Sequence, residues 1–225
     1  MKSALPKVLH PLCGLALVEY PIAAAFEVGA ERVVVVTSGQ PQLSQALVSR
    51  YGTERLSVVV QDPPRGTGDA VRVGLAAVTT QRAMVLYGDT PLVRASDLSQ
   101  LIAALEVPGQ DLAILTALLE EPFGYGRVLR DGAGNVEEVR EQKDLRTDAE
   151  LSVREVNAGM YAAQTDKLRA AVAELKPNNA QGEFYLTDVV ASLAKVSRVA
   201  SVLGKVDALM GVNDRSDLSR AEELL

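Results

Sequence analysis

The segment that most constrains the fold of this chain covers residues 83–92, a short apolar run that ends in Gly88-Asp89 and is stopped by Thr90-Pro91. An apolar run of this length without alternation predicts a strand that is buried on both faces, as in a parallel sheet covered by helices. Asp89 then lies at the carboxyl end of the strand, the edge where open α/β sheets bind ligands. Its carboxylate could hold a hard cation such as Mg²⁺, or it could be a solvated turn residue that starts the next helix.

Strands and helices alternate through the first half of the chain. The predicted strands cover residues 33–36, 56–60, 83–92 and 112–117, and the predicted helices cover residues 18–28, 41–50, 69–78 and 96–105. Such a β-α-β-α-β-α-β order predicts a doubly wound, mostly parallel sheet. Upstream of it, Pro6 predicts an extended segment that contains Lys7.

The pattern changes after residue 120. Residues 125–130 and 135–141 flank Asp131-Gly132-Ala133-Gly134, which is a hairpin signal. Further strands are predicted over residues 153–161 and 199–203, and helices over residues 166–175, 185–194 and 216–225. This half therefore predicts an antiparallel or mixed insertion that covers the ligand edge of the sheet.

The composition narrows the chemistry that this chain can perform. A net charge of -6 over 225 residues argues against non-specific binding to nucleic acid or to an anionic membrane. No apolar run approaches the ~20 residues that span a bilayer, and no signal-peptide pattern opens the sequence. The single cysteine, Cys13, which we assign to packing, fits a reducing cytoplasm. With His10 as the sole histidine, which we assign to structure, catalysis must depend on carboxylates, amides, lysine and bound metal.

The loop over residues 61–70 contains two prolines and two glycines. Gly66 and Gly68 would let the backbone approach a flat or anionic ligand, and Gln61 and Thr67 could add hydrogen bonds of the kind that recognise a base. A glycine-rich turn between a strand and a helix without any ligand is the alternative interpretation of the same residues.

Several short motifs together resemble one family. They are Leu5-Pro6-Lys7, Gln61 with Gly66-Thr67-Gly68, Tyr87-Gly88-Asp89, Tyr125-Gly126-Arg127, Glu141-Gln142-Lys143-Asp144, Glu155-Val156-Asn157-Ala158-Gly159, Asn178-Asn179-Ala180-Gln181-Gly182-Glu183 and Gly211-Val212-Asn213. In order and spacing they resemble the uridylyltransferase domain of bacterial bifunctional N-acetylglucosamine-1-phosphate uridylyltransferases.

The resemblance implies a nucleotide-diphospho-sugar transferase fold and an Mg²⁺-dependent reaction. UTP and N-acetylglucosamine 1-phosphate would give UDP-N-acetylglucosamine, which feeds bacterial cell-wall polymers such as peptidoglycan, and pyrophosphate. It implies catalytic roles for Lys7 and Asp89 and metal ligation by Asp89 and Asn213. The implied substrate contacts are Lys7, Gln61, Gly66, Thr67, Tyr87, Gly88, Asp89, Gly126, Glu141, Asn157 and Asn213.

Two departures from the family shape the domain prediction. The family opens with a strand and a loop of the form Leu-x-x-Gly-x-Gly-Thr-x-Met, and Met1 aligns with its last residue. The family also carries a C-terminal left-handed β-helix with acetyltransferase activity, which forms most of the homotrimer contacts. We therefore expect residues 1–225 to be a nucleotidyltransferase domain truncated at its N-terminus, without the β-helix and monomeric.

Alternative functions stay open at this level. Glu141 could be a solvated acid at a strand end, because Glu137 and Glu138 lie nearby, and Asn157 could be a strand-end cap. The chain could transfer a nucleotide to glucose 1-phosphate or to another sugar phosphate. It could also be a non-catalytic remnant that binds UDP-sugars weakly or not at all.

Overall fold

The computed structural model describes residues 5–225. Met1, which the resemblance aligns with the end of the glycine-rich loop, lies outside the described residues. The helices are α1 (Glu19–Glu27), α2 (Pro41–Tyr51), α3 (Thr67–Leu75), α4 (Ala95–Leu105), α5 (Asp148–Ser152), α6 (Thr165–Ala173), α7 (Asp188–Ala194) and α8 (Arg215–Leu224), with short 3₁₀ helices η1 (Lys7–Leu9), η2 (Gln142–Asp144) and η3 (Val206–Leu209). The strands are β1 (Pro11–Leu12), β2 (Leu15–Ala16), β3 (Val33–Thr37), β4 (Leu56–Val60), β5 (Arg82–Val85), β6 (Gln110–Leu118), β7 (Arg127–Arg130), β8 (Val136–Arg140), β9 (Glu155–Gln164) and β10 (Arg198–Leu203).

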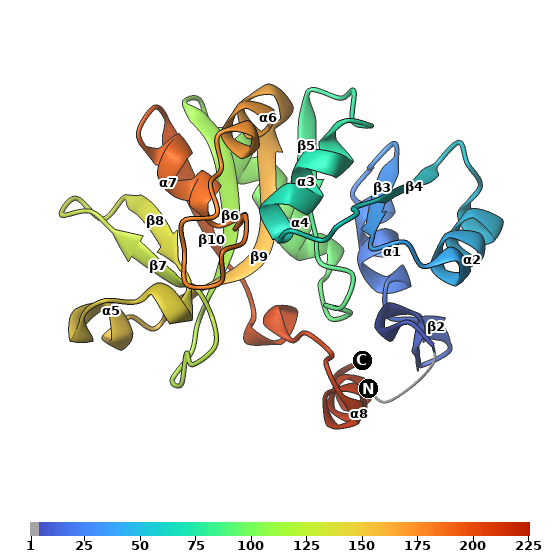
Figure 1. Cartoon of the computed structure of the whole chain (residues 1–225). Coiled ribbons are helices and arrows are strands. Elements are labelled where there is room, and N and C mark those ends of the chain that lie inside the picture. Colours follow the sequence, from blue (N-terminus) through green and yellow to red (C-terminus); the bar gives the residue numbers. More distant parts are fainter. Residues whose placement is uncertain (1–4) are drawn as a thin grey trace.

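The central sheet has six strands, in the order β10-β6-β9-β7-β8, with β5 paired to β9 as well (Figure 1). β10 and β6 are parallel, whereas β9 runs antiparallel to both β5 and β6. The predicted α/β class is confirmed, but the predicted arrangement of the second half is wrong in one respect. β9 and β10 belong to the main sheet, and β9 separates β5 from β6, where a wholly parallel order would place the two side by side.

β3 and β4 form a separate parallel pair beside the central sheet. Within residues 5–225, β3 pairs only with β4 and β5 pairs only with β9. This division explains why the prediction for residues 83–92 is only partly correct. β5 ends at Val85 and its apolar residues are half-buried, because a ladder partner covers only one of its edges.

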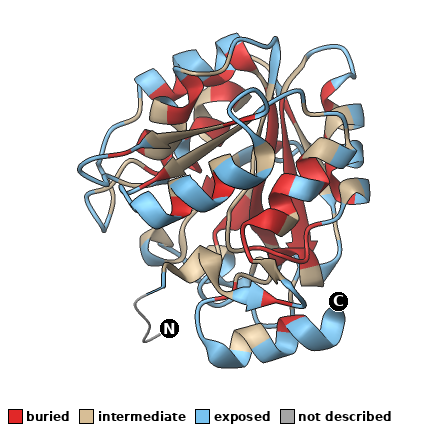
Figure 2. Cartoon of the chain, turned by 90° about the vertical axis from the view of Figure 1, so that its right-hand side faces the viewer, coloured by how far each residue is buried: buried red, intermediate tan, exposed pale blue. Residues whose placement is uncertain are grey.

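Two groups of helices cover the central sheet (Figure 2). Because side chains alternate along a strand, Leu112 and Ile114 of β6 pack under α3, α6 and α7, whereas Ala113 and Leu115 pack against α4 and η3 on the other face. β9 has eight consecutive buried residues, and six of them belong to these two cores. Burying so much apolar area is the main stabilising contribution to a sheet of this kind.

Two smaller cores hold the segments that surround the sheet. α1 and α2 pack against β3 and β4 through Ile22, Leu47 and Leu56. α8 packs against the β1–β2 hairpin region through Ala221 and Leu12, together with Val212 from the preceding turn. This last cluster brings a late turn of the chain against its first described residues.

The predicted extended conformation at Lys7 is wrong. Lys7 begins η1, and the backbone amide of Leu9 donates to the carbonyl of Pro6 at 2.9 Å. A proline disfavours helical conformation in the residue before it, not in the residue after it, so the constraint applied to Leu5 alone.

Candidate active site

Three residues that are distant in sequence meet at one point of the structure. The ammonium group of Lys7 lies 2.5 Å from Oδ2 of Asp89 and 3.0 Å from Oδ1 of Asn213. The side chains of Lys7 and Asp89 are 35% and 28% exposed. Two side-chain oxygens therefore share one cationic group at a position that solvent and ligands can reach.

Backbone contacts hold this arrangement together. The amide of Val212 donates to the carbonyl of Asp89 at 2.8 Å, which ties the turn before α8 to the loop after β5. The amide of Asn213 donates to the carboxylate of Asp217, and Asp214 caps the N-terminus of α8. A Cβ on Gly88 would lie 3.3 Å from Val18, so the chain passes close to α1 just before Asp89.

The fit to a metal ion can be judged from the donors. Residues 5–225 contain no group of three or more His, Cys, Asp or Glu side chains that could hold a metal. Asp89 and Asn213 would supply two oxygen ligands, and Mg²⁺ commonly takes few protein ligands and completes its shell with water and phosphate. The Lys7 ammonium shows that their oxygens can share a cation. These donors fit a magnesium ion.

The loop between β4 and α3 packs tightly against the residues before α7. The amide of Gly68 donates to the carbonyl of Phe184 at 2.7 Å, and the amide of Phe184 donates to the carbonyl of Arg65 at 2.9 Å. A Cβ on Gly66 would lie 2.7 Å from the carbonyl oxygen of Phe184. Gly66 and Gly68 thus have a packing role against the backbone of the protein itself, which the sequence did not indicate.

Gln61 is buried at the start of this loop beside Asp69. Its Nε2 donates to the carbonyl of Gly66 at 3.1 Å and to Oδ2 of Asp69 at 2.8 Å. Asp69 also accepts from Arg65 and Arg72. Burial by itself would raise the pKa of Asp69, but hydrogen bonds from Gln61, Arg72 and Arg65 lower it to about 2. Sequence reasoning missed Asp69, which looked like an ordinary acid at a helix start.

This pKa predicts how the stability of the protein depends on pH. A carboxyl group whose pKa is lower in the folded state stabilises that state above its unfolded pKa, and the contribution is lost as the pH falls through the folded pKa. Asp69 should therefore contribute about 2 kcal/mol to the free energy of unfolding, lost between about pH 4 and pH 2. Urea unfolding at a series of pH values should show a smaller acid loss in Asp69→Asn than in the wild type. The same acid loss in both proteins would contradict this assignment.

Tyr87 lies between the first residue of α3 and the strand β9. Burial, followed by the charges of Glu141 and Asp89, raises its pKa to about 12, against a hydrogen bond with Thr67 that lowers it. Thr67 in turn accepts from the amide of Leu186 at 3.1 Å. The ring of Tyr87 lies against Gly159, which has a φ of +75°. The phenol is therefore neutral and fixed at both its ring and its hydroxyl.

Gly126, Glu141 and Asn157 form a second group. A Cβ on Gly126 would lie 3.4 Å from Oε2 of Glu141, and the amide of Asn157 donates to the carbonyl of Gly126 at 2.9 Å. Glu141 accepts from the hydroxyl of Thr187 at 3.0 Å. Burial raises the pKa of Glu141, the Thr187 hydrogen bond lowers it, and the charge of Asp144 raises it further.

This second group corrects the alternative interpretations of its members. Asn157 is not a strand-end cap, because it lies inside β9 and its side chain donates to the hydroxyl of Tyr161 at 2.7 Å. Glu141 is not a fully solvated acid. Thr187 and Tyr161 were not predicted as site residues. Thr187 contacts a residue that is distant in sequence, and Tyr161 makes a buried hydrogen bond within β9 that no motif indicates.

The acidic side chains near Glu141 give this part of the site a negative field. Burial, and then the charges of Asp144, Glu141 and Glu138, raise the pKa of Asp188 to about 6. Asp144 accepts from the amide of Ala180 at 2.9 Å, which attaches the polar loop over residues 178–183 to the same region. Such carboxylates suit a ligand whose hydroxyl groups donate hydrogen bonds, whereas the Lys7 end suits an anion.

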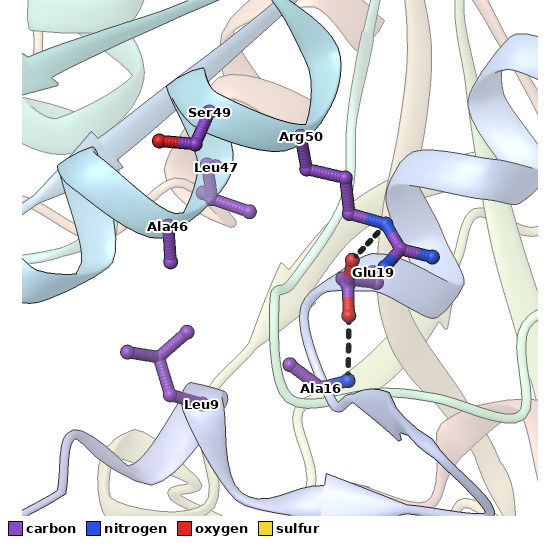
Figure 3. Close-up of a pocket in the computed structure, with 7 residues that line it drawn as sticks. All are labelled: Leu9, Ala16, Glu19, Ala46, Leu47, Ser49 and Arg50. Carbon is purple, nitrogen blue, oxygen red and sulfur yellow. Dashed lines mark hydrogen bonds and ion pairs between the residues drawn. The ribbon is translucent and has the colours of Figure 1, made fainter.

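One hollow of the structure lies away from these residues. It is lined by Leu9, Ala16, Glu19, Ala46, Leu47, Ser49 and Arg50 (Figure 3). Across it Glu19 accepts from Nε of Arg50 at 2.6 Å and from the amide of Ala16 at 2.7 Å. None of the predicted site residues lines this hollow. We assign its ion pair to holding α2 against the first residue of α1, while the hydrogen bond from Ala16 ties that residue to β2.

A comparison with solved structures agrees with the α/β fold. The solved structure of a CMP:2-keto-3-deoxy-manno-octonic acid synthetase complexed with CTP superposes with a TM-score of 0.74 at 20% identity and covers 99% of this chain and 92% of that one. At this identity the likeness supports the fold alone.

Residues 1–154 match the model of the MobA-like NTP transferase domain. The chain belongs to this family of nucleotidyltransferase domains.

Curated relatives match the whole chain. "Bifunctional protein GlmU" of Sorangium cellulosum (strain So ce56) is 45% identical over 232 residues, which is 100% of this chain and 49% of that protein. The proteins of the same name from Caldanaerobacter subterraneus subsp. tengcongensis and Pseudomonas entomophila are 36% and 40% identical over 100% and 99% of this chain. The chain spans about half the length of these relatives. The matches confirm the resemblance predicted from the motifs.

Among residues 5–225, no helix combines the length and the apolar character that a membrane crossing would need.

Proposed function

We propose that this chain transfers a uridylyl group from UTP to N-acetylglucosamine 1-phosphate, giving UDP-N-acetylglucosamine and pyrophosphate. The observation that carries the proposal is the convergence of Lys7, Asp89 and Asn213 on one shared cation position. A cationic centre suits a triphosphate, and the group of acidic side chains around Glu141 suits the hydroxyls of a sugar.

The reaction would be an in-line attack of the sugar phosphate oxygen on the α-phosphorus of UTP. Such a transfer depends mainly on positioning and charge neutralisation. Lys7 would neutralise phosphate charge, while Asp89 and Asn213 would hold Mg²⁺. When bound, that ion would offset the negative charge that develops on the phosphates. Gln61, Gly66 and Thr67 would contact the base, with Tyr87 and Gly88 beside the nucleoside and the sugar.

The acceptor sugar would lie against Gly126, Glu141 and Asn157. Glu141 would accept hydrogen bonds from sugar hydroxyls, and its hydrogen bond from Thr187 holds the carboxylate in place. The side chain of Asn157 is held in turn by Tyr161 and by the amide of Gly159. Fixed partners of this kind favour one sugar over another, because a ligand that leaves a buried polar group unpaired binds less tightly.

Pyrophosphate release from UTP, N-acetylglucosamine 1-phosphate and Mg²⁺ tests the proposal. Glucose 1-phosphate as a competing acceptor distinguishes the proposed reaction from transfer to another sugar phosphate. The assay should include the 225-residue chain and a version extended by a strand and a loop of the form Leu-x-x-Gly-x-Gly-Thr-x-Met, because β3 and β5 each leave one edge without a ladder partner in residues 5–225. If neither version releases pyrophosphate, the proposal is wrong.

Removing the Lys7 side chain should have opposite effects on the affinity for Mg²⁺ and on the affinity for UTP. Its ammonium lies where a cation shared by Asp89 and Asn213 would bind. Lys7→Ala should therefore bind Mg²⁺ up to about fivefold more tightly without nucleotide, since a partly exposed ion pair is worth at most ~1 kcal/mol. The same variant should bind UTP more weakly. Calorimetric titrations with Mg²⁺ and with UTP measure both effects, and changes of the same sign would contradict the shared position.

A further inference from the structure

The side-chain amide of Gln61 has a fixed orientation. A primary amide offers two N–H donors and one carbonyl acceptor. Both partners of Nε2, the carbonyl of Gly66 and the carboxylate of Asp69, can only accept. The NH₂ group must therefore face these two groups, and a flipped amide would place three acceptor oxygens together. No hydrogen bond to Oε1 is present in residues 5–225, and Oε1 is not among the enclosed polar atoms without a partner.

Asp69 is fixed in place and stays ionised, so it keeps the side-chain amide of Gln61 in this orientation. Its side chain is 2% exposed, and Nη2 of Arg65 lies 3.0 Å from Oδ1. Nε of Arg72 lies 3.1 Å from the same oxygen. With two guanidinium groups beside it and a pKa of about 2, the carboxyl group carries no proton near neutral pH. It can accept from Gln61 but never donate to it.

We propose that Asp69 is a positioning residue that fixes Gln61 so that Oε1, and not the NH₂ group, faces the base, where Oε1 accepts a hydrogen bond from N3–H of uracil. The inference rests on the proposed uridylyl transfer and deepens it. On its pairing edge uracil has a single donor, N3–H, between the acceptors O2 and O4. An atom that can only accept is complementary to N3–H and to no other group on that edge.

This geometry discriminates between bases in two ways, because it attracts uracil and repels cytosine. Cytosine carries a lone pair at N3, which would face Oε1 without a proton between them. Leaving a buried partner unpaired lowers affinity by roughly 10- to 100-fold. Asp69 acts only through Gln61, so its removal should change the selectivity for the base more than the affinity for the phosphates.

Modified nucleotides test the orientation of Gln61 in the wild-type protein. Binding of UTP, 3-methyl-UTP and 4-thio-UTP is measured by calorimetry. Methylation at N3 removes the donor and should weaken binding by roughly 10- to 100-fold. Sulfur at position 4 weakens an acceptor that Oε1 does not contact, and should change the affinity by less than about threefold.

Asp69→Asn tests the positioning role. An amide at position 69 can donate to Oε1 or accept from Nε2, so Gln61 can adopt both orientations. The penalty for 3-methyl-UTP should then fall below about tenfold. Asp62→Asn, which removes an exposed carboxylate from the same loop, is the matched control and should keep the wild-type penalty. Asp69→Ser, which can also donate and accept, is the second variant in case Asp69→Asn does not fold.

Each outcome supports or overturns the inference. If 3-methyl-UTP binds as tightly as UTP, or if only 4-thio-UTP binds weakly, Oε1 does not face N3 and the inference is wrong, while uridylyl transfer stands. If a folded Asp69 variant loses as much affinity for 3-methyl-UTP, relative to UTP, as the wild type does, Asp69 does not position Gln61. Binding of CTP more tightly than UTP would overturn the uridylyl transfer itself, and no binding of any uridine nucleotide would overturn both.

Discussion

Asp89→Asn is expected to lower the rate of pyrophosphate release by at least ~10²–10³, the loss typical when one oriented charge-stabilising group is removed from a reacting phosphate or acyl centre. The substitution keeps an oxygen near Lys7 and Asn213 but removes its negative charge. A divalent cation would then be held by two uncharged amide oxygens, and the ammonium of Lys7 would lose its ionic partner. We expect the maximal rate to fall and the Mg²⁺ concentration needed for half of that rate to rise.

Steady-state rates over a series of Mg²⁺ concentrations measure this effect, in whichever version of the chain turns over. The matched control is Asp111→Asn. Asp111 lies at the amino end of β6, a strand that runs in the same direction as β5 because both are antiparallel to β9. The control residue therefore lies toward the opposite edge of the sheet and should leave the rate unchanged. Normal turnover by Asp89→Asn would exclude Asp89 from the metal site.

Gly159→Ala should lower the free energy of unfolding and weaken substrate binding together. Gly159 has a φ of +75°, and a Cβ there would lie 2.7 Å from Cδ2 of Tyr87 and closer still to Cε2. A left-handed conformation costs a non-glycine residue ~1–2 kcal/mol, and forcing an atom into a packed site costs ~1–3 kcal/mol. The expected loss is therefore ~2–5 kcal/mol. The displaced Tyr87 ring would also disturb its hydrogen bond with Thr67.

Gly134→Ala separates the two causes. Gly134 has a φ of +85° in the hairpin between β7 and β8, and a Cβ there would meet nothing within 4 Å. It should show the backbone cost alone and leave UTP binding intact. Urea unfolding and calorimetric UTP binding measure both variants. Equal effects of the two substitutions would mean that the contact between Gly159 and Tyr87 has no role in the site.

Local patterns predicted most of the elements, because a helix or strand depends on neighbouring residues. The four-valine run gave β3, the apolar run over residues 56–60 gave β4, and Gly29 ended α1 as expected. The short helix α5 was missed, since its five residues carry no apolar periodicity. Lys7 begins a 3₁₀ helix and is not extended, because Pro6 restricts only the residue before it.

The motifs also identified the candidate site residues, but not the contacts between them. Lys7, Asp89 and Asn213 come from three segments that are far apart in the sequence, and α8, which follows Asn213, packs on the β1–β2 region, which follows Lys7. Thr187, Tyr161 and Asp69 enter the site through single long-range or buried hydrogen bonds. A local pattern cannot reveal such partners.

The sequence by itself determined the α/β class, the family and which polar residues are available for chemistry, because these follow from local periodicity and from the residue types present. Only the tertiary structure decided that β9 lies between β5 and β6, that Gly66 faces Phe184, and that Lys7 lies between Asp89 and Asn213. Strand order and side-chain pairing depend on which apolar faces are buried together, and the free energy of that burial belongs to the packed chain and not to any one of its segments.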